Sequence, residues 1–238
     1  MNKQVSIILP TYNEKENLPI LIDEIIQEFE LIKTEYEIII IDDHSPDGTW
    51  KVALDIEKKI SRVKSIIRKK NKSLASAIKI GINNSSFPII CIMDTDFSHP
   101  PKDIPRMLQY IDTYDMVWAS RYISGGNMEA LGKKWVQKWF SYIFNLYLKT
   151  ILRIQILDST NGFFLTRRNV LSKINLDNVF SGYGDFAFKL LYKLRNKDVP
   201  MIEIPFTYEK RKYGISKTNI IEVSIKYFVE SIKLILFK

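Results

Sequence analysis

The chain has 238 residues, of which 46% are hydrophobic and 26% charged, a balance typical of a soluble globular protein with a sizeable buried core. This composition excludes a low-complexity protein, and the single cysteine, Cys91, excludes an internal disulfide. The formal net charge of +8 favours anionic partners, without choosing among nucleic acid, phosphorylated metabolites and a membrane surface.

The first half of the sequence alternates strand and helix patterns. Short apolar runs predict strands, and apolar residues at helical spacing predict helices between them. Continuous apolar strands that alternate with helices predict an α/β fold with a mostly parallel sheet flanked by helices. In chain order, the predicted strands are Val5–Leu9, Tyr36–Ile41, Val63–Ile67, Pro88–Met93 and Met116–Ser120, and the predicted helices are Asn17–Leu31, Thr49–Ser61, Leu74–Asn83 and Pro105–Thr113.

The second half is less regular, and we find no linker that would separate two domains. No window offers about 20 uninterrupted apolar residues, so we predict no transmembrane helix. The N-terminal apolar run is also short, which favours a strand over a signal peptide. The predicted elements are a helix over Ala130–Leu152, a turn at Asp158–Gly162 leading into Phe163–Leu165, a short element at Val170–Ile174, a helix over Asp185–Arg195, a strand over Met201–Tyr208 and a terminal helix over Ile220–Phe237.

Polar residues follow four of the predicted strands, at the carboxyl end of each. In open α/β sheets, ligands bind in the crevice outside those ends. Chance could supply one or two such positions, but four in turn indicate a site. They are Thr11 to Glu14, Asp42 with Asp43, Asp94 to Asp96, and Arg121.

Asp94 and Asp96 are the centre of the predicted site. Two carboxylates spaced i, i+2 at a strand end can approach one hard divalent cation, and Mg²⁺ is commonly held by one or two carboxylates plus substrate phosphates. The cation would act as a Lewis acid on a departing nucleoside diphosphate. Such pairs also occur on ordinary loops, but a position after a buried strand, beside three other polar strand ends, favours a metal site.

Five motifs, taken in order, resemble the family-2 inverting glycosyltransferases, and within them the chain is most similar to polyprenol-phosphate (dolichol-phosphate) mannosyltransferases. The resemblance spans roughly Val5 to Lys217 and implies the GT-A (nucleotide-diphospho-sugar transferase) fold and a reaction that inverts the anomeric centre. The motifs are Leu9-Pro-Thr-Tyr-Asn-Glu14, Ile41-Asp-Asp-His-Ser-Pro-Asp-Gly-Thr49, Met93-Asp-Thr-Asp-Phe-Ser-His-Pro-Pro101, Ser120-Arg-Tyr122 and Arg211-Lys-Tyr-Gly-Ile-Ser-Lys217.

The resemblance also implies roles for individual residues. Asp94, Thr95 and Asp96 would meet ribose, diphosphate and a Mg²⁺ or Mn²⁺ ion, with Ser98 as a further metal neighbour. Arg121 would join Asp94 and Asp96 in catalysis. The nucleoside would be held by Pro10, Tyr12, Glu14, Ile41 and Asp43, and the phosphates would be contacted by Arg121, Arg211 and Lys217.

Three positions depart from the family pattern and leave the sugar and the acceptor open. Ser73-Leu74-Ala75 stands where the family often has Gly-Leu-Gly, Phe164 where an arginine is expected, and Phe188 at a usual glutamate position.

The acceptor can also be considered chemically. A sugar hydroxyl generally needs a positioned base, for which Asp185 is the candidate. A phosphate monoester is already mostly ionised at neutral pH, so it needs cations more than a base. The basic loop Tyr208–Lys217 could supply them, although a solvated hairpin with a charged face is the alternative. Its cations are Lys210, Arg211, Lys212 and Lys217.

Two helices combine basic and apolar residues. Trp135 and Trp139 lie on successive turns among Lys133, Lys134 and Lys138, and the stretch Ile220–Lys238 is similarly mixed. This pattern suits a helix lying on an anionic bilayer. The alternative is that both helices pack on the sheet with one wet face.

We therefore expect a catalytic domain over residues 1–217, and over 218–238 an amphipathic helix that packs on the domain or the membrane surface. The hypothesis is a peripheral enzyme at the cytoplasmic face of a membrane, moving mannose or glucose from a nucleotide-sugar to a polyprenyl (dolichyl or undecaprenyl) phosphate. A separate membrane subunit stays open, and nucleic acid is not an expected partner. The alternatives are a family-2 enzyme acting on a sugar hydroxyl in polysaccharide synthesis and a non-catalytic nucleotide- or membrane-binding module.

Overall fold

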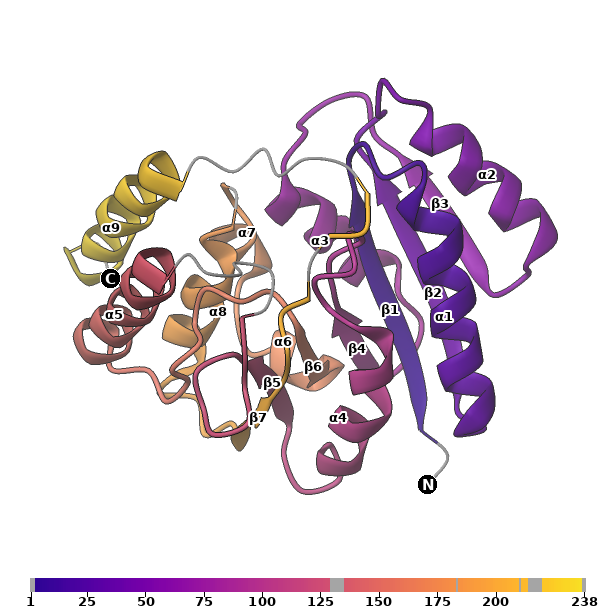
Figure 1. Cartoon of the computed structure of the whole chain (residues 1–238). Coiled ribbons are helices and arrows are strands. Elements are labelled where there is room, and N and C mark those ends of the chain that lie inside the picture. Colours follow the sequence, from indigo (N-terminus) through magenta and orange to yellow (C-terminus); the bar gives the residue numbers. More distant parts are fainter. Residues whose placement is uncertain (1–2, 129–134, 183, 210, 214–219, 237–238) are drawn as a thin grey trace.

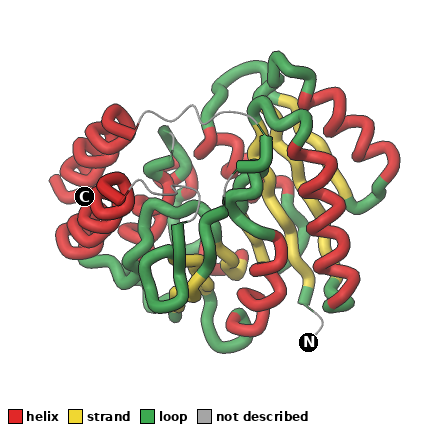
Figure 2. Tube along the Cα trace, viewed as in Figure 1, coloured by secondary structure: helices red, strands yellow, loops and turns green. Residues whose placement is uncertain are grey.

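The computed structural model describes residues 3–128, 135–182, 184–209, 211–213 and 220–236. Within these residues, seven strands form one sheet in the order β3-β2-β1-β4-β6-β5-β7 (Figure 1, Figure 2). The strands are β1 (Gln4–Thr11), β2 (Glu35–Asp42), β3 (Val63–Ile67), β4 (Ile89–Ile92), β5 (Met116–Ser120), β6 (Phe164–Arg167) and β7 (Met201–Pro205).

Helices cover both faces of the sheet. Successive strand residues point to opposite faces, and on each face they pack into a separate hydrophobic cluster. Ile8 and Ile39 belong to the cluster under α3 and α8, whereas Ile7 and Ile38 belong to the cluster under α1 and α4. Apolar residues at consecutive strand positions are thereby all buried. The helices are α1 (Asn17–Leu31), α2 (Thr49–Lys59), α3 (Leu74–Asn84), α4 (Ile104–Tyr110) after the short 3₁₀ helix η1 (Pro101–Asp103), α5 (Trp135–Leu152), α6 (Arg168–Leu171), α7 (Leu176–Val179), α8 (Phe186–Leu194) and α9 (Ile220–Leu236).

The predicted strands and helices of the first half are confirmed, with ends shifted by a few residues at most. The last predicted strand stops early, at Pro205, although its chain still pairs locally through a bridge between Thr207 and Asn127. The short helices η1 and α7 were not predicted, because three or four residues are too few to show a helical period. The predicted helix over Ala130–Leu152 is observed from Trp135, and residues 129–134 lie outside the described part of the chain.

Strand direction decides what meets at the carboxyl edge of the sheet. β6 runs antiparallel to both of its neighbours, β4 and β5, while the other paired strands are parallel. The segment that leads into β6, Asp158–Phe163, therefore starts at the same edge at which the parallel strands end. This edge collects side chains from both halves of the sequence.

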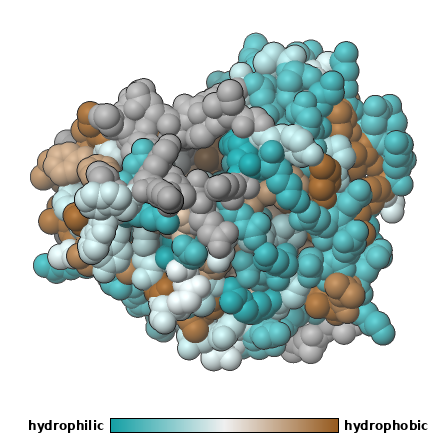
Figure 3. All heavy atoms as spheres, viewed as in Figure 1, coloured by the Kyte–Doolittle hydropathy of each residue, from teal (hydrophilic) through white to brown (hydrophobic). Residues whose placement is uncertain are grey.

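Helices α5 and α9 lie side by side beyond the sheet (Figure 1). Tyr147 and Ser231 are joined by a hydrogen bond of 3.2 Å, while Leu148 packs into the core. The outer surface of the pair carries many exposed apolar side chains, and brown spheres lie among white and teal ones on this side of Figure 3. We call it the α5–α9 face; its exposed members are Trp135, Trp139, Phe140, Ile143, Leu146, Ile151, Ile225, Phe228, Val229, Ile232, Ile235 and Leu236. Among the described helices, none combines the length and hydropathy needed to cross a bilayer.

Candidate active site

The loop after β4 presents two carboxylates in different surroundings. Thr95 Oγ1 donates to the carbonyl of Pro10 at 3.1 Å, which fastens this loop to the end of β1. Phe97 has a left-handed φ of 68°, and the resulting turn lets the Ser98 backbone N–H and Oγ donate to Asp96 Oδ1 at 3.0 and 2.5 Å. Asp94 keeps 42% of its side chain exposed, against 12% for Asp96. Ser98 therefore orients Asp96, while Asp94 faces solvent.

His99 stabilises the same loop by a hydrogen bond to its backbone. Its Nδ1 accepts from the backbone N–H of Asp94 at 2.9 Å, which places the ring proton on Nε2, 3.0 Å from Asn161 Oδ1. Asn161 Nδ2 in turn donates to the carbonyl of Ala119 at 2.6 Å. His99 is thus a buried, positioning residue that links β4, β5 and the segment before β6.

Arg211 brings a distant segment to the carboxylates. Its Nη2 donates to Asp96 Oδ2 at 2.6 Å, and its Nη1 donates to Glu14 Oε1 at 3.3 Å. Asn17 Nδ2 donates to Glu14 Oε2 at 2.6 Å and to the carbonyl of Tyr213 at 3.3 Å. Residues from the ends of β1 and β4 and from the last loop therefore form one polar group.

The pKa values of the carboxyls differ because their surroundings differ. Burial raises the pKa of Glu14 to about 7, against the opposing effects of Asn17 and Arg211. Although part of the Asp94 side chain is exposed, the surrounding residues desolvate its carboxyl and raise the pKa of Asp94, and the charge of Asp96 adds to this rise. For Asp96, burial is outweighed by Arg211 and the Ser98 hydrogen bonds, so its pKa is lowered. Asp96 is accordingly the carboxylate held ionised.

The end of β2 contains two buried aspartates with different partners. Asp42 is buried and accepts from Ser45 N–H at 2.9 Å and from Ser45 Oγ at 2.6 Å, so it builds the following turn. Asp43 accepts from Arg68 Nε at 2.6 Å, and burial raises the pKa of Asp43 even though Arg68 lowers it. Arg68 is also fixed by the carbonyl of Ser73, at 3.1 Å, whose side chain caps α3.

Arg121 is tied to a buried partner. Its Nε donates to Asp158 Oδ2 at 2.8 Å and its Nη2 to Asp158 Oδ1 at 2.5 Å, a bidentate pair in which Asp158 is fully buried. Although burial opposes its charge, Asp158 raises the pKa of Arg121. The guanidinium also lies 5.2 and 5.5 Å from the ring centroids of Tyr122 and Tyr208. Arg121 thus joins β5 to the segment before β6.

Asp185 belongs to a different group of charges. It is buried at the start of α8 and forms an ion pair with Lys189, which also lies 3.1 Å from Glu230 on α9. This trio lines a pocket of about 660 Å³ between α8 and α9. The structure therefore places Asp185 beside the α5–α9 face, in a cluster distinct from that of Asp94 and Asp96.

Two of the remaining predicted residues, Tyr12 and Ile41, lie at or beside the same edge. Tyr12 is 48% exposed, whereas the Ile41 side chain is fully buried in the core. Only backbone atoms of Ile41 could reach a nucleoside, and its carbonyl already accepts from Thr11 Oγ1 at 3.3 Å. Lys217 lies outside the described residues.

Several residues of the described site were not predicted, among them Arg68, Asn17 and Asp158. Arg68 directly follows the predicted strand Val63–Ile67, so a fifth polar strand end was available in the sequence. Asn17 is the first residue of α1 and gives no signal of its contacts with Glu14 and the last loop. Asp158 was placed in a turn, but its pairing with Arg121 depends on the direction of β6.

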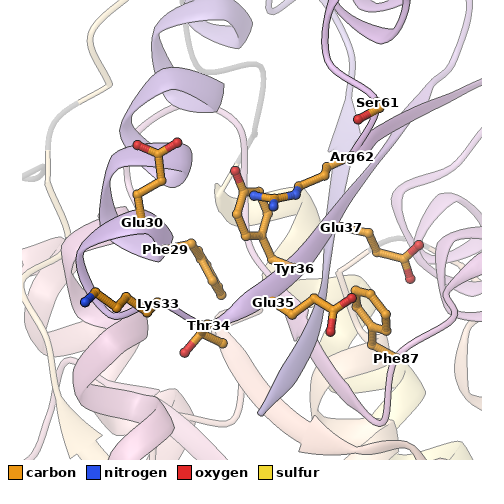
Figure 4. A pocket seen from close by; sticks show the side chains of 10 residues that line it. All are labelled: Phe29, Glu30, Lys33, Thr34, Glu35, Tyr36, Glu37, Ser61, Arg62 and Phe87. Atoms are coloured by element: carbon orange, nitrogen blue, oxygen red, sulfur yellow. The ribbon is translucent and has the colours of Figure 1, made fainter. Parts of the chain in front are cut away.

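A second pocket lies at the opposite edge of the sheet, beside the start of β2 (Figure 4). It has a volume of about 710 Å³, and the guanidinium of Arg62 lies over the ring of Tyr36 at 5.0 Å from its centroid. Because ligands of α/β sheets bind at the carboxyl ends, this pocket does not rival the site above. Its charged lining consists of Glu30, Lys33, Glu35, Glu37 and Arg62.

The donor set fits a divalent cation shared with a substrate. In the described part of the chain, no three His, Cys, Asp or Glu side chains are grouped to hold a metal. Mg²⁺ bound by one or two carboxylates plus phosphate oxygens does not need such a group. The partly exposed Asp94 and Asp96, whose pKa is lowered, would provide that pair, and Arg211 donates to Asp96 Oδ2.

Comparison with known proteins places the chain among sugar-transferring proteins. The sequence pattern described as Glycosyl transferase family 2 matches residues 6–174. The dolichol-phosphate mannosyltransferase of Pyrococcus furiosus is 35% identical over 219 residues, which cover 90% of this chain but 59% of the relative. The polyprenol monophosphomannose synthase of Mycolicibacterium smegmatis is 32% identical over 228 residues, covering 92% of this chain and 84% of the relative.

Solved structures resemble the fold as a whole. The glucosyl-3-phosphoglycerate synthase of Mycobacterium tuberculosis, in complex with Mn²⁺, UDP and phosphoglyceric acid, superposes with a TM-score of 0.70 at 16% identity. The match covers 97% of this chain and 78% of that structure. At this identity the likeness speaks for the fold alone.

Proposed function

The chain belongs to glycosyltransferase family 2, and on this premise we propose that it transfers a hexose, mannose or glucose, from a nucleotide-sugar to a polyprenyl phosphate with inversion. The α/β fold is that of the GT-A glycosyltransferases. The observation that carries the proposal is the meeting of Asp94, Asp96 and Arg211 at the carboxyl edge of the sheet. The names of the two curated relatives support the choice of acceptor.

On the donor side, Asp43 and Arg68 suit particular bases. A carboxylate can accept from a ring N–H, and a guanidinium beside it can donate to the neighbouring carbonyl. Uracil and guanine offer that pair of groups, whereas adenine does not. Tyr12, half exposed at the end of β1, is placed to lie against the base or ribose. We therefore propose UDP- or GDP-sugars as donors.

For the diphosphate, Asp94 and Asp96 would hold Mg²⁺ or Mn²⁺. The cation would neutralise the charge that develops on the leaving diphosphate. Support comes from the structural neighbour that contains Mn²⁺ and UDP. Ser98 keeps Asp96 oriented, and Arg211 supplies a guanidinium to the phosphates. In the transfer, an oxygen of the acceptor phosphate bonds to the anomeric carbon as the bond to the diphosphate breaks.

On the acceptor side, the polyprenyl chain must stay in a lipid phase while its phosphate reaches the strand ends. The α5–α9 face offers the twelve exposed apolar side chains named above. Aromatic and aliphatic residues with lysines nearby are suited to the membrane interface. We propose that this face attaches the enzyme to the cytoplasmic side of a membrane, directly or through a membrane subunit.

A transfer assay tests the proposal. Radiolabelled GDP-mannose and UDP-glucose would be incubated with the protein, Mn²⁺ and liposomes that contain polyprenyl phosphate. Label should move into the organic phase and should not do so when the metal is chelated. Label in a water-soluble oligosaccharide would instead identify a sugar hydroxyl as acceptor, and no transfer from any UDP- or GDP-sugar would contradict the enzyme assignment.

A further inference from the structure

The segment around Arg211 is fastened across the ends of two strands and α1. The Glu209 backbone N–H donates to the carbonyl of Ser98 at 3.3 Å, and Lys212 forms an ion pair of 2.6 Å with Glu24. Between these contacts, Arg211 reaches Asp96 and Glu14. A residue far along the sequence is thus held directly on one of the predicted metal-binding carboxylates.

The contact with Asp96 uses the oxygen that a metal would need. Asp96 Oδ1 already accepts two hydrogen bonds from Ser98, at 3.0 and 2.5 Å. Oδ2 accepts from Arg211 Nη2 at 2.6 Å. Arg211 takes one of the two lone pairs of Oδ2, and a divalent cation on the other would lie beside the guanidinium and be repelled by it.

We propose that Arg211 occupies the cation position on Asp96 until a metal–nucleotide complex binds, and that it then exchanges this carboxylate for the donor diphosphate. Arginine is suited to both partners, since its planar fork pairs with carboxylates and with phosphates in the same geometry. The exchange rests on the proposed function, because it requires a diphosphate at the strand ends.

The exchange should weaken the binding of metal alone and strengthen the binding of metal together with a nucleoside diphosphate. Metal alone must break the Arg211–Asp96 pair without offering Arg211 a new partner, so it binds weakly. Metal together with a nucleoside diphosphate replaces the lost partner, so the two ligands bind cooperatively. Arg211 would therefore make the site selective for the complete metal–diphosphate pair over a free cation.

Calorimetry with Arg211→Gln separates these effects. Mn²⁺ titrated without nucleotide should bind about tenfold more tightly to this variant than to the wild type, because the competing cation has gone. UDP or GDP titrated in the presence of Mn²⁺ should bind about tenfold more weakly, because a phosphate partner has gone. The paramagnetic resonance signal of free Mn²⁺ gives an independent measure of the first change.

The matched control is Lys102→Gln, which also removes a positive charge from the segment's surroundings. Lys102 pairs with Glu209 at 2.7 Å rather than with Asp96, so free Mn²⁺ affinity should stay as in the wild type. Equal tightening in both variants, or unchanged or weaker Mn²⁺ binding in Arg211→Gln, would overturn the exchange. Wild-type protein that binds UDP and GDP without any effect of Mn²⁺ would instead defeat the proposed function.

Discussion

The carboxyl edge of the sheet and the α5–α9 face differ in the kind of side chain that each places in an unfavourable environment. At the edge, three arginines that are buried or partly buried are each paired with a buried aspartate: Arg68 with Asp43, Arg121 with Asp158, and Arg211 with Asp96. On the α5–α9 face, large apolar groups such as Trp135 and Leu236 stay 67% and 69% exposed.

The difference indicates which kind of partner each region is suited to bind. A buried charge is costly unless it is paired, so the arginines hold the edge together while offering donors to an anionic ligand. Exposed apolar residues gain free energy when another phase covers them. One region is thus suited to a charged, water-soluble donor and the other to a lipid surface.

The largest expected effect is that of Asp94→Ala on transfer. Losing one of the two carboxylates proposed to bind the metal should lower the rate about 10³-fold, since metal-ion stabilisation of a leaving group is worth several kcal/mol. The transfer assay measures the change, and Asp112→Ala is the control, because Asp112 is an exposed aspartate paired with Lys3. A non-catalytic module would show no transfer in either the wild type or the variant. Membrane association of the Asp94→Ala variant should equal that of the wild type.

The next largest effect concerns the pairing of charges at the edge. Arg121→Met leaves the fully buried Asp158 without its bidentate partner and should lower the free energy of unfolding by about 3–5 kcal/mol. Urea denaturation measures it. Lys58→Met, which removes an exposed pair with Asp55, should change stability little. Equal losses of unfolding free energy in the two variants would mean that the buried pair at the edge contributes no more stability than an exposed pair.

Glu14 provides a pH test of the same region. Its pKa is about 7 in the folded protein against 4.5 ordinarily, so folding binds the proton more tightly and the free energy of unfolding falls as pH rises from 4.5 to 7. Glu14→Gln should therefore be more stable than the wild type above pH 7, by about 2–3 kcal/mol, and show no advantage below pH 4.5. Parallel pH profiles of thermal unfolding for the two proteins would contradict this.

The smallest expected effect lies on the α5–α9 face. Trp139→Glu should weaken binding to phosphatidylglycerol vesicles about tenfold, because it removes an exposed indole and adds a charge. Tyr110→Glu on α4 is the control, since Tyr110 is also an exposed aromatic but lies off this face. Vesicle co-sedimentation measures both, and equal losses would mean that the α5–α9 face has no special role.

Much of the fold follows from local patterns. Apolar runs such as Val63–Ile67 and Met116–Ser120 coincide with the observed strands, and Asn17–Leu31 coincides with α1. These patterns succeed because a buried parallel strand must be apolar on both faces and a covering helix must be apolar on one. The positions of Asp43, Asp94 and Asp96 at one edge follow directly from the ends of the predicted strands Tyr36–Ile41 and Pro88–Met93.

What the sequence alone determined, then, is the main strands and helices, the family motifs and the carboxylates at the strand ends. Only the tertiary structure decided which groups these carboxylates meet: Asp158 opposite Arg121, Arg68 beside Asp43, and Arg211 on Asp96. The reason is physical, because a strand or helix is specified by neighbouring residues. A pair such as Arg211 and Asp96, 115 positions apart, depends on strand order, on the reversed direction of β6 and on loop paths that no local period encodes.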